Sequence, residues 1–287
     1  MGRGSPVLVV LAAGRARRYG GCKPLAPIGP NGEAVIDLLA GDALTAGFST
    51  LVLVVGPATG AAIRYHVEHV WPRSLDVHFA LQEAPLGTVD AVLAASGRLG
   101  GTPFVVANAD DLYGPDALAL ARAHVADTDH DAPNALVGFR LRSAVVGREP
   151  VTRGVCRSDA AGRLLGIEER RQVQPLDHDR FSVKDGHEPT ELDGDVLVSM
   201  NLFGFAPGII GHLESAMATR TASVDSEVLL PEVVSNLAAS GAADAAVRVL
   251  PTEDRCIGVT HPGDLELVQA EVKRLVATGQ RPAGPWG

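Results

Sequence analysis

Cysteine, aromatic residues and long apolar runs are all scarce in this 287-residue chain. The three cysteines, Cys22, Cys156 and Cys256, are odd in number and lack the spacing of a metal site, which favours a reducing compartment. No stretch approaches the roughly 18 apolar residues that a membrane span needs. Aromatic residues make up 4% of the chain, so aliphatic side chains must form the core. We therefore expect a cytoplasmic protein with no membrane partner.

A broad basic surface is also missing. The net charge of −9 argues against nucleic acid or a membrane surface as a partner, because both require a basic face. Against this background, Arg15, Arg17, Arg18 and Lys23 fall within nine residues, directly after the apolar run VLVVLA. The whole chain holds only three lysines, and one of them lies in this cluster. The cluster predicts a local site for an anion.

The first half of the chain alternates short apolar runs with longer segments of helical pattern. The alternation favours a three-layer α/β arrangement with a largely parallel sheet. Strands are predicted at 7–11, 51–55, 77–81, 104–107 and 135–139, and helices at 35–47, 59–70, 88–98 and 115–126.

The second half is less regular. Residues 140–200 show little apolar periodicity, and 172–195 predict a mobile excursion, with a hairpin over a site as one form it could take. A strand over 196–205 and helices over 227–239 and 262–277 follow. The tail, 278–287, is expected to fray. We expect one domain over residues 1–287.

The loop after the first strand fits neither of two familiar phosphate motifs. The dinucleotide pattern G-x-G-x-x-G fails because Ala16 stands where the second glycine is needed, and the P-loop fails because Pro24 follows Lys23. The segment LAAGRARR…KPL instead resembles the signature of sugar-1-phosphate nucleotidyltransferases, with Gly14, Arg18 and Lys23 on its glycine, arginine and lysine.

This resemblance implies a three-layer α/β/α Rossmann-like nucleotidyltransferase fold with a mostly parallel, mixed central sheet. It implies a nucleotide-binding half over 5–135 and a sugar-phosphate-binding half over 136–265, followed by a C-terminal helix and tail over 266–287. Arg18 and Lys23 are then catalytic, because transfer of a nucleotidyl group concentrates negative charge on the phosphates. The residues expected to bind nucleotide in this loop are Ala12, Ala13 and Gly14.

Two further motifs agree with that resemblance. In LQEAPLGTVDAV, Gln82 and Gly87 match residues that read the nucleobase edge, and an amide can both donate to and accept from uracil or thymine. In VVANADD, Asp110 matches the aspartate that binds Mg²⁺, and the resemblance implies that Asp110 is also catalytic and that Asn108 binds the sugar phosphate. Glu227 is the expected second metal ligand, with Asp225 as the alternative.

The acceptor is expected in the second half. VTRGVCRSDAAGRLLGIEERR resembles the family segment RYGVVEFD…G…I…EK, so that Gly154, Glu169 and Arg170 fall on residues that hold the sugar and its phosphate. Here arginine replaces the lysine of the family, which changes reach and geometry. Asn201 in SMNLFGF falls where family members line the sugar pocket, although a buried amide bonded to backbone is equally compatible with this pattern.

The resemblance implies an enzyme of nucleotide-sugar biosynthesis that joins a nucleoside triphosphate, UTP or dTTP by preference, to a sugar 1-phosphate and releases pyrophosphate. Mg²⁺ is the expected cofactor, and a homo-oligomer is left open. Two alternatives stay open as well. One is a cytidylyltransferase acting on a non-sugar phosphate, and the other is a nucleotide-sensing homologue without catalysis.

Overall fold

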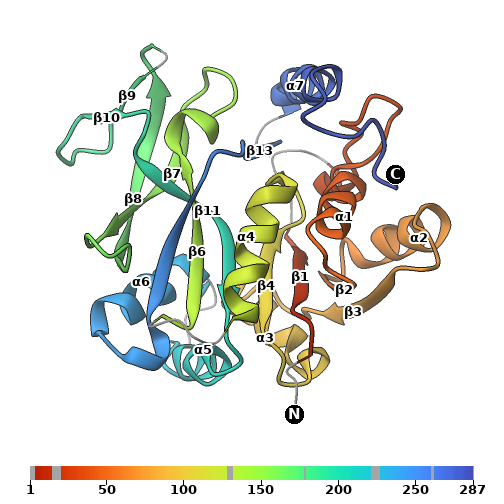
Figure 1. Ribbon diagram of the computed structural model, residues 1–287, viewed down its shortest axis with the longest axis horizontal. Helices are drawn as coiled ribbons and strands as arrows, with labels where there is room; N and C mark the ends of the chain where they lie inside the picture. The colour runs from red at the N-terminus through yellow and green to blue at the C-terminus, as the bar shows by residue number, and fades with distance from the viewer. Residues whose placement is uncertain are drawn as a thin grey trace.

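An eleven-stranded mixed sheet runs through the molecule, with helices packed on both of its faces (Figure 1). The computed structural model describes residues 4–14, 21–127, 132–177, 179–220, 227–259 and 262–286. The strands of this sheet are β1 (Val7–Ala12), β2 (Thr50–Val55), β3 (Asp76–Leu81), β4 (Phe104–Asn108), β6 (Asn134–Arg140), β7 (Val151–Ser158), β8 (Leu164–Pro175), β9 (Arg180–Ser182), β10 (Glu191–Asp193), β11 (Leu197–Phe205) and β12 (Val247–Thr252). A separate antiparallel pair is formed by β5 (Asp111–Leu112) and β13 (Ile257–Gly258).

The helices connect these strands and cover the sheet. They are α1 (Val35–Thr45), α2 (Gly60–Val70), α3 (Thr88–Leu99), α4 (Pro115–Ala126), α5 (Ile209–Ala218), α6 (Leu230–Ser240) and α7 (Leu265–Ala277), with 3-10 turns η1 (Lys23–Leu25), η2 (Leu141–Ser143), η3 (Ala243–Ala245) and η4 (Pro262–Asp264). Every strand and helix predicted in the first half is present. β7 and β8 form where the sequence showed no regular pattern, and 172–195 contribute β9 and β10 to the sheet.

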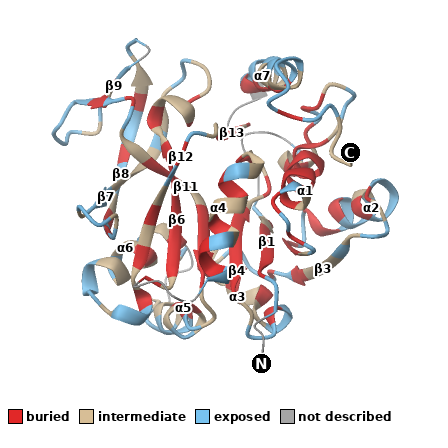
Figure 2. Cartoon of the chain, in the orientation of Figure 1, coloured by how far each residue is buried: buried red, intermediate tan, exposed pale blue. Residues whose placement is uncertain are grey.

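Two hydrophobic cores lie on the two sides of the sheet, and strand alternation divides the residues between them. In β1, Leu8 and Val10 belong to the core under α1, α4 and α7, whereas Val7 and Val9 belong to the core under α3, α5 and α6. Figure 2 shows the burial concentrated in the central strands. The three-layer α/β/α prediction is therefore confirmed.

The sheet branches at β11. This strand pairs with β6 along one edge, while its other edge pairs with β4 near Phe203 and with β7 near Ser199. A register irregularity separates these two contacts, and within it Asn201 adopts a φ of +62°. Because β4 and β7 share one edge of β11 without pairing with each other, a gap opens between their ends.

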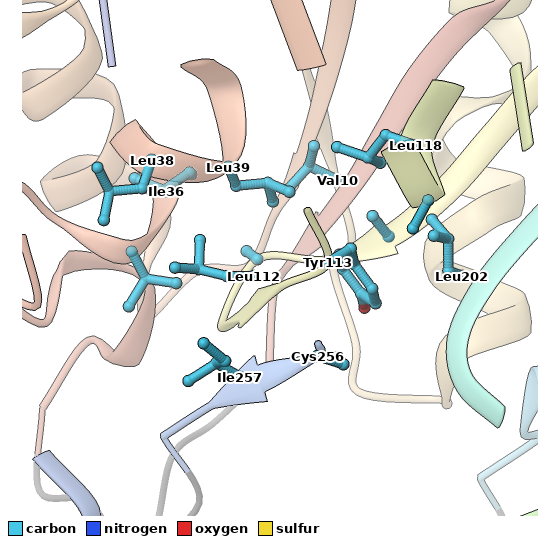
Figure 3. Close-up of a cluster of buried hydrophobic side chains, with 14 of the residues drawn as sticks. Val10, Ile36, Leu38, Leu39, Leu112, Tyr113, Leu118, Leu202, Cys256 and Ile257 are labelled. Carbon is cyan, nitrogen blue, oxygen red and sulfur yellow. The ribbon is translucent and has the colours of Figure 1, made fainter. Parts of the chain in front are cut away.

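β1, β2, β3 and β4 run parallel, so their carboxyl ends meet at one edge of the sheet. Ligands of open α/β sheets bind at such edges. β5 and β13 lie next to it, and Figure 3 shows Leu112 and Tyr113 packed between α1, α4 and the side chains of Cys256, just before β13, and Ile257 within it. Within the described parts of the chain, no helix is long and apolar enough to cross a membrane.

The C-terminal tail does not fray as predicted, because a buried ion pair ties it to α1. The Arg281 guanidinium donates to Asp42 Oδ2 at 2.9 Å and to Leu38 O at 2.8 Å. Trp286 then packs on Trp71, with ring centroids 5.7 Å apart. Composition alone predicted that this segment would fray, whereas the residues that bind Arg281 lie some 240 residues earlier in the chain.

We expect Arg281→Met to destabilise the fold by about 3–5 kcal/mol, because it leaves the Asp42 carboxylate buried without its partner. Urea unfolding measures the difference. Arg274→Met is the matched control: Arg274 forms an exposed ion pair with Glu271 on α7, and its loss should cost less than about 1 kcal/mol. Equal costs for the two variants would contradict the assignment.

Candidate active site

The carboxyl end of β4 carries the central acidic residue of the site. The β1–β4 ladder extends through the bond from Ala109 N to Leu11 O, 3.1 Å, which places Asp110 one residue beyond the strand pair. The η1 turn brings Lys23 to it from the other side, with 3.7 Å between Lys23 Nζ and Asp110 Oδ2. Lys23 and Asp110, two of the three residues predicted to be catalytic, are thus adjacent, although 87 positions separate them in the sequence.

Asp111 is held by a hydrogen-bond network beneath this pair. Asn108 Nδ2 donates to Asp111 Oδ2 at 3.0 Å, while the Tyr113 hydroxyl accepts from Asn108 N and donates to Met200 O, both at 3.0 Å. The Tyr113 hydroxyl therefore joins the end of β4 to the irregular segment of β11. Burial and the neighbouring Asp110 raise the pKa of Asp111 to about 7.

A cavity of about 620 Å³ occupies the gap where β4 and β7 leave β11. Lys23 and Asp110 lie on its wall with Asn108, and β7, β8 and β11 contribute the predicted residues Gly154, Glu169 and Asn201. The structure thus gathers six of the predicted site residues around one space. A Cβ on Gly154 would lie 2.7 Å from the Ile167 side chain, so packing against β8 also requires a glycine there.

Arg170 is not on this wall, contrary to its predicted place beside the acceptor. Its guanidinium is buried, with 2% exposure, and Nε donates to Asp185 Oδ2 at 2.7 Å. Successive side chains of a strand point to opposite faces, so the cavity receives Glu169 and Arg171, which pair at 2.7 Å. Arg171, and not Arg170, is therefore the arginine that this part of β8 places on the cavity wall.

The predicted base-reading residues, Gln82 after β3 and Gly87 before α3, are not part of this wall, although the adjacent Thr88 is. Gln82 Nε2 donates to Gly87 O and to Asp90 Oδ2, both at 2.9 Å, so both N–H groups of the amide are engaged. Gly87 has a φ of +105°, and a Cβ there would lie 2.3 Å from Val228 O. A close backbone approach therefore explains the glycine.

The remaining predicted residues have mixed placements. Arg18 and Asp225 lie outside the described residues. Ala12, Ala13 and Gly14 follow β1 and are not part of the cavity wall. Glu227 is exposed and also lies off that wall, which receives Glu232 from the first turn of α6 instead.

Asp110 suits a hard cation. Its side chain retains 35% exposure, yet it faces a concave space beside a second carboxylate, and this desolvation raises its pKa. A divalent ion bound there would offset both the desolvation of Asp110 and the repulsion between the two carboxylates. Among the described residues no three His, Cys, Asp or Glu side chains form a ready-made metal cage. Mg²⁺ commonly takes one or two carboxylates from a protein and completes its shell with phosphates and water.

Sequence reasoning did not select several residues of the cavity wall. They are Asp111, Glu149, Thr152, Arg153, Arg171, Glu232 and Asp264. Strand alternation applied to EERR could have found Arg171 once β8 was known to be a strand. Arg153 and Glu232 carried no local signal, because long-range pairing of β7 and packing of α6 bring them here.

The lysine of η1 and the aspartate at the carboxyl end of β4 thus lie on the wall of one polar cavity. Residues 8–174 match the family model described as the MobA-like NTP transferase domain, and the chain belongs to that family. The predicted resemblance to nucleotidyltransferases is confirmed at this level.

Two individual proteins extend the comparison. The Bifunctional protein GlmU of Sorangium cellulosum (strain So ce56) is 26% identical over 242 residues, which cover 83% of this chain and 46% of that protein. The chain therefore spans about half the length of this curated relative. The inositol-1-phosphate CTP transferase from T. maritima matches with a TM-score of 0.66 at 15% identity, over 94% of this chain and 98% of that one. At this identity the likeness shows a shared fold.

We expect Arg170→Met and Arg171→Met to differ in their effect on the stability of the fold. Arg170→Met should lower the urea midpoint at pH 7, because it removes the partner of Asp185, whereas Arg171→Met removes only an exposed pair and should leave the midpoint near wild type. Equal midpoints for the two variants would contradict the structure.

The same pair of variants should respond differently to acid. The Arg170 hydrogen bond holds the pKa of Asp185 well below its usual range. A carboxylate with a lowered pKa stabilises the fold above its unfolded pKa of about 3.9 and loses that contribution as pH falls further. The gap in stability between wild type and Arg170→Met should therefore narrow below about pH 4.

Proposed function

We propose that this nucleotidyltransferase joins a nucleoside triphosphate to a sugar 1-phosphate. A phosphate oxygen of the acceptor attacks the α-phosphorus, the bond from that phosphorus to the bridging oxygen breaks, and pyrophosphate leaves. One observation carries the proposal: a single cavity has the Lys23–Asp110 pair on its wall together with Glu169, Arg171 and Asn201. Carboxylate and amide groups suit a polyhydroxylated acceptor because they accept hydrogen bonds from its hydroxyl groups.

In this proposal Lys23 lies against the α-phosphate and stabilises the charge that develops there. Arg18, as the sequence predicts, would bind the triphosphate bidentately. Asp110 would hold Mg²⁺, which when bound neutralises phosphate charge in the transferring group. Until the metal and substrates bind, the Lys23 ammonium offsets part of the free-energy cost of desolvating the Asp110 carboxylate, with 3.7 Å between Lys23 Nζ and Asp110 Oδ2.

The geometry of Gln82 bears on the choice of base. Both N–H groups of its amide face acceptors within the protein, so only Oε1 is available to a ligand. That oxygen can accept from N3–H of uracil or thymine, and equally from the N4 amino group of cytosine. The sequence-based preference for UTP or dTTP loses its main argument, and CTP becomes an equal candidate.

A second candidate function is cytidylyl transfer to a non-sugar phosphate, such as a cyclitol or alcohol phosphate. The fold shared with an inositol-1-phosphate CTP transferase over 94% of the chain favours it, and the acceptor-only state of Gln82 is compatible with it. Both candidates use the same phosphate chemistry and differ in base and acceptor.

Pyrophosphate release should be measured for five nucleoside triphosphates against sugar 1-phosphates and inositol 1-phosphate, with and without Mg²⁺. One metal-dependent pair well above the rest supports the proposal and identifies both substrates. Turnover confined to CTP with inositol 1-phosphate would replace it with the second candidate. Nucleotide binding without pyrophosphate release in any pair would indicate the non-catalytic homologue.

Lys23→Ala and Asp110→Asn should each lower kcat by at least about 100-fold, since each removes charge stabilisation at the transferring phosphate. Circular dichroism and thermal unfolding check that the fold is retained. Lys273→Ala is the control, because Lys273 is exposed on α7 far from the cavity wall, and it should keep full activity. Near-normal turnover in either site variant would remove that residue from the mechanism.

Gln82→Ala should relax the choice of base more than it slows the best substrate, because the remaining acceptor of the amide is lost. The measurement is kcat/KM for the preferred triphosphate and for its two strongest competitors. Unchanged ratios would exclude Gln82 from the base site.

A further inference from the structure

Arg153 gives the cavity a cation that the sequence did not select. It lies on β7 next to Gly154, and the cavity wall contains it together with Lys23 and Arg171. The family segment RYGVVEFD has a tyrosine immediately before the glycine, so no role for this arginine carries over from the resemblance.

The other two cations of the wall already have carboxylate partners. Lys23 lies beside Asp110, and Arg171 pairs with Glu169 at 2.7 Å. Arg153 has no ion pair within the described residues. Its guanidinium donates instead to backbone carbonyls, from Nε and Nη2 to Ala144 O at 3.1 and 2.7 Å, and from Nη1 to Thr152 O at 2.8 Å.

This bonding fixes the guanidinium without satisfying it. An arginine has five N–H donors, and the three bonds leave two for a ligand. Burial lowers the pKa of Arg153, although Cys256 and Asp111 nearby oppose that shift. A desolvated cation of this kind is stabilised by an anion that supplies both charge and hydrogen-bond acceptors.

The position of Arg153 indicates which anion. Lys23 lies beside Asp110 at the end of the parallel strand β4, where the triphosphate is proposed to bind. Arg153 comes from the opposite branch of the β11 fork, next to Gly154 on β7 and across from Arg170 on β8, and it shares the cavity wall with Glu169 and Arg171. A group bound there would lie on the acceptor side of the cavity.

We propose that Arg153 binds the phosphate of the acceptor and holds it for attack on the α-phosphorus. This assignment rests on the proposed function and deepens it: the acceptor is a phosphate monoester, recognised by a guanidinium whose position Ala144 O fixes. Arg153 is then a substrate-binding residue distinct from Lys23, which serves the nucleotide.

The test is binding of inorganic phosphate, titrated by calorimetry while the triphosphate that binds most tightly is held at saturation. The variants are Arg153→Gln, Arg153→Lys and, as a matched control, Arg157→Gln on the same strand. Arg157 is exposed and lies off the cavity wall. The dissociation constant of the triphosphate and the thermal unfolding temperature are measured for each variant.

Arg153→Gln should weaken phosphate binding roughly 10- to 100-fold, as expected for loss of a charged hydrogen-bond donor, with triphosphate binding within about 3-fold of wild type. Arg153→Lys keeps the charge, so its phosphate affinity should lie between those of wild type and Arg153→Gln, and Arg157→Gln should match wild type. Arg153→Lys also keeps the measurement decisive if Arg153→Gln unfolds: a Lys variant equal to wild type in phosphate affinity would overturn the inference.

Three other outcomes would overturn it as well. They are a wild type that binds no phosphate under these conditions, an unchanged affinity in Arg153→Gln, and equal weakening for phosphate and triphosphate. Failure of the proposed function is separate: if no pair of substrates releases pyrophosphate, phosphate titration without nucleotide still reports whether Arg153 binds the anion.

Discussion

The fork of the sheet at β11 is the constraint on which the site depends. One strand edge has to pair first with β7 and then with β4, and the irregular segment around Asn201 makes the change possible. The Tyr113 hydroxyl then fixes the opening, because it bonds to the backbone of β4 and of β11 at once. A continuous ladder here would close the cavity, since backbone pairing would fill the gap.

The two hydrophobic cores make this opening rigid. Each strand of the parallel half buries alternate side chains on opposite faces, so the carboxyl ends of β1 and β4 have little freedom to move. The polar residues of the site can then stand at the sheet edge without being needed for packing. That separation allows a lysine and an aspartate to be held for chemistry on a chain that is acidic overall.

Two buried arginines hold the outer segments to this centre. Arg170 ties β8 to the segment before β10 through Asp185, and Arg281 ties the tail to α1 through Asp42. Both are structural, whereas Arg153 and Arg171 face the cavity. Arginine therefore either holds two segments together or faces the cavity, and its partners decide between these roles. Asp185 and Asp42 pair with Arg170 and Arg281, whereas the backbone carbonyls that bind Arg153 leave some of its N–H donors unused.

The sequence by itself determined the alternating strands and helices of the first half, because periodicity is a local property that burial imposes on each element. It also pointed to Lys23 and Asp110, because the motif of Asp110 directly follows the strand β4 and that of Lys23 belongs to the loop that follows β1. Only the tertiary structure decided that Arg171 rather than Arg170 faces the cavity, since one residue of strand parity reverses a side chain. It likewise decided the places of Arg153, Glu232 and Arg281. Each of these depends on pairing between segments far apart in the chain, and the free energy of such contacts leaves no pattern in the neighbouring residues.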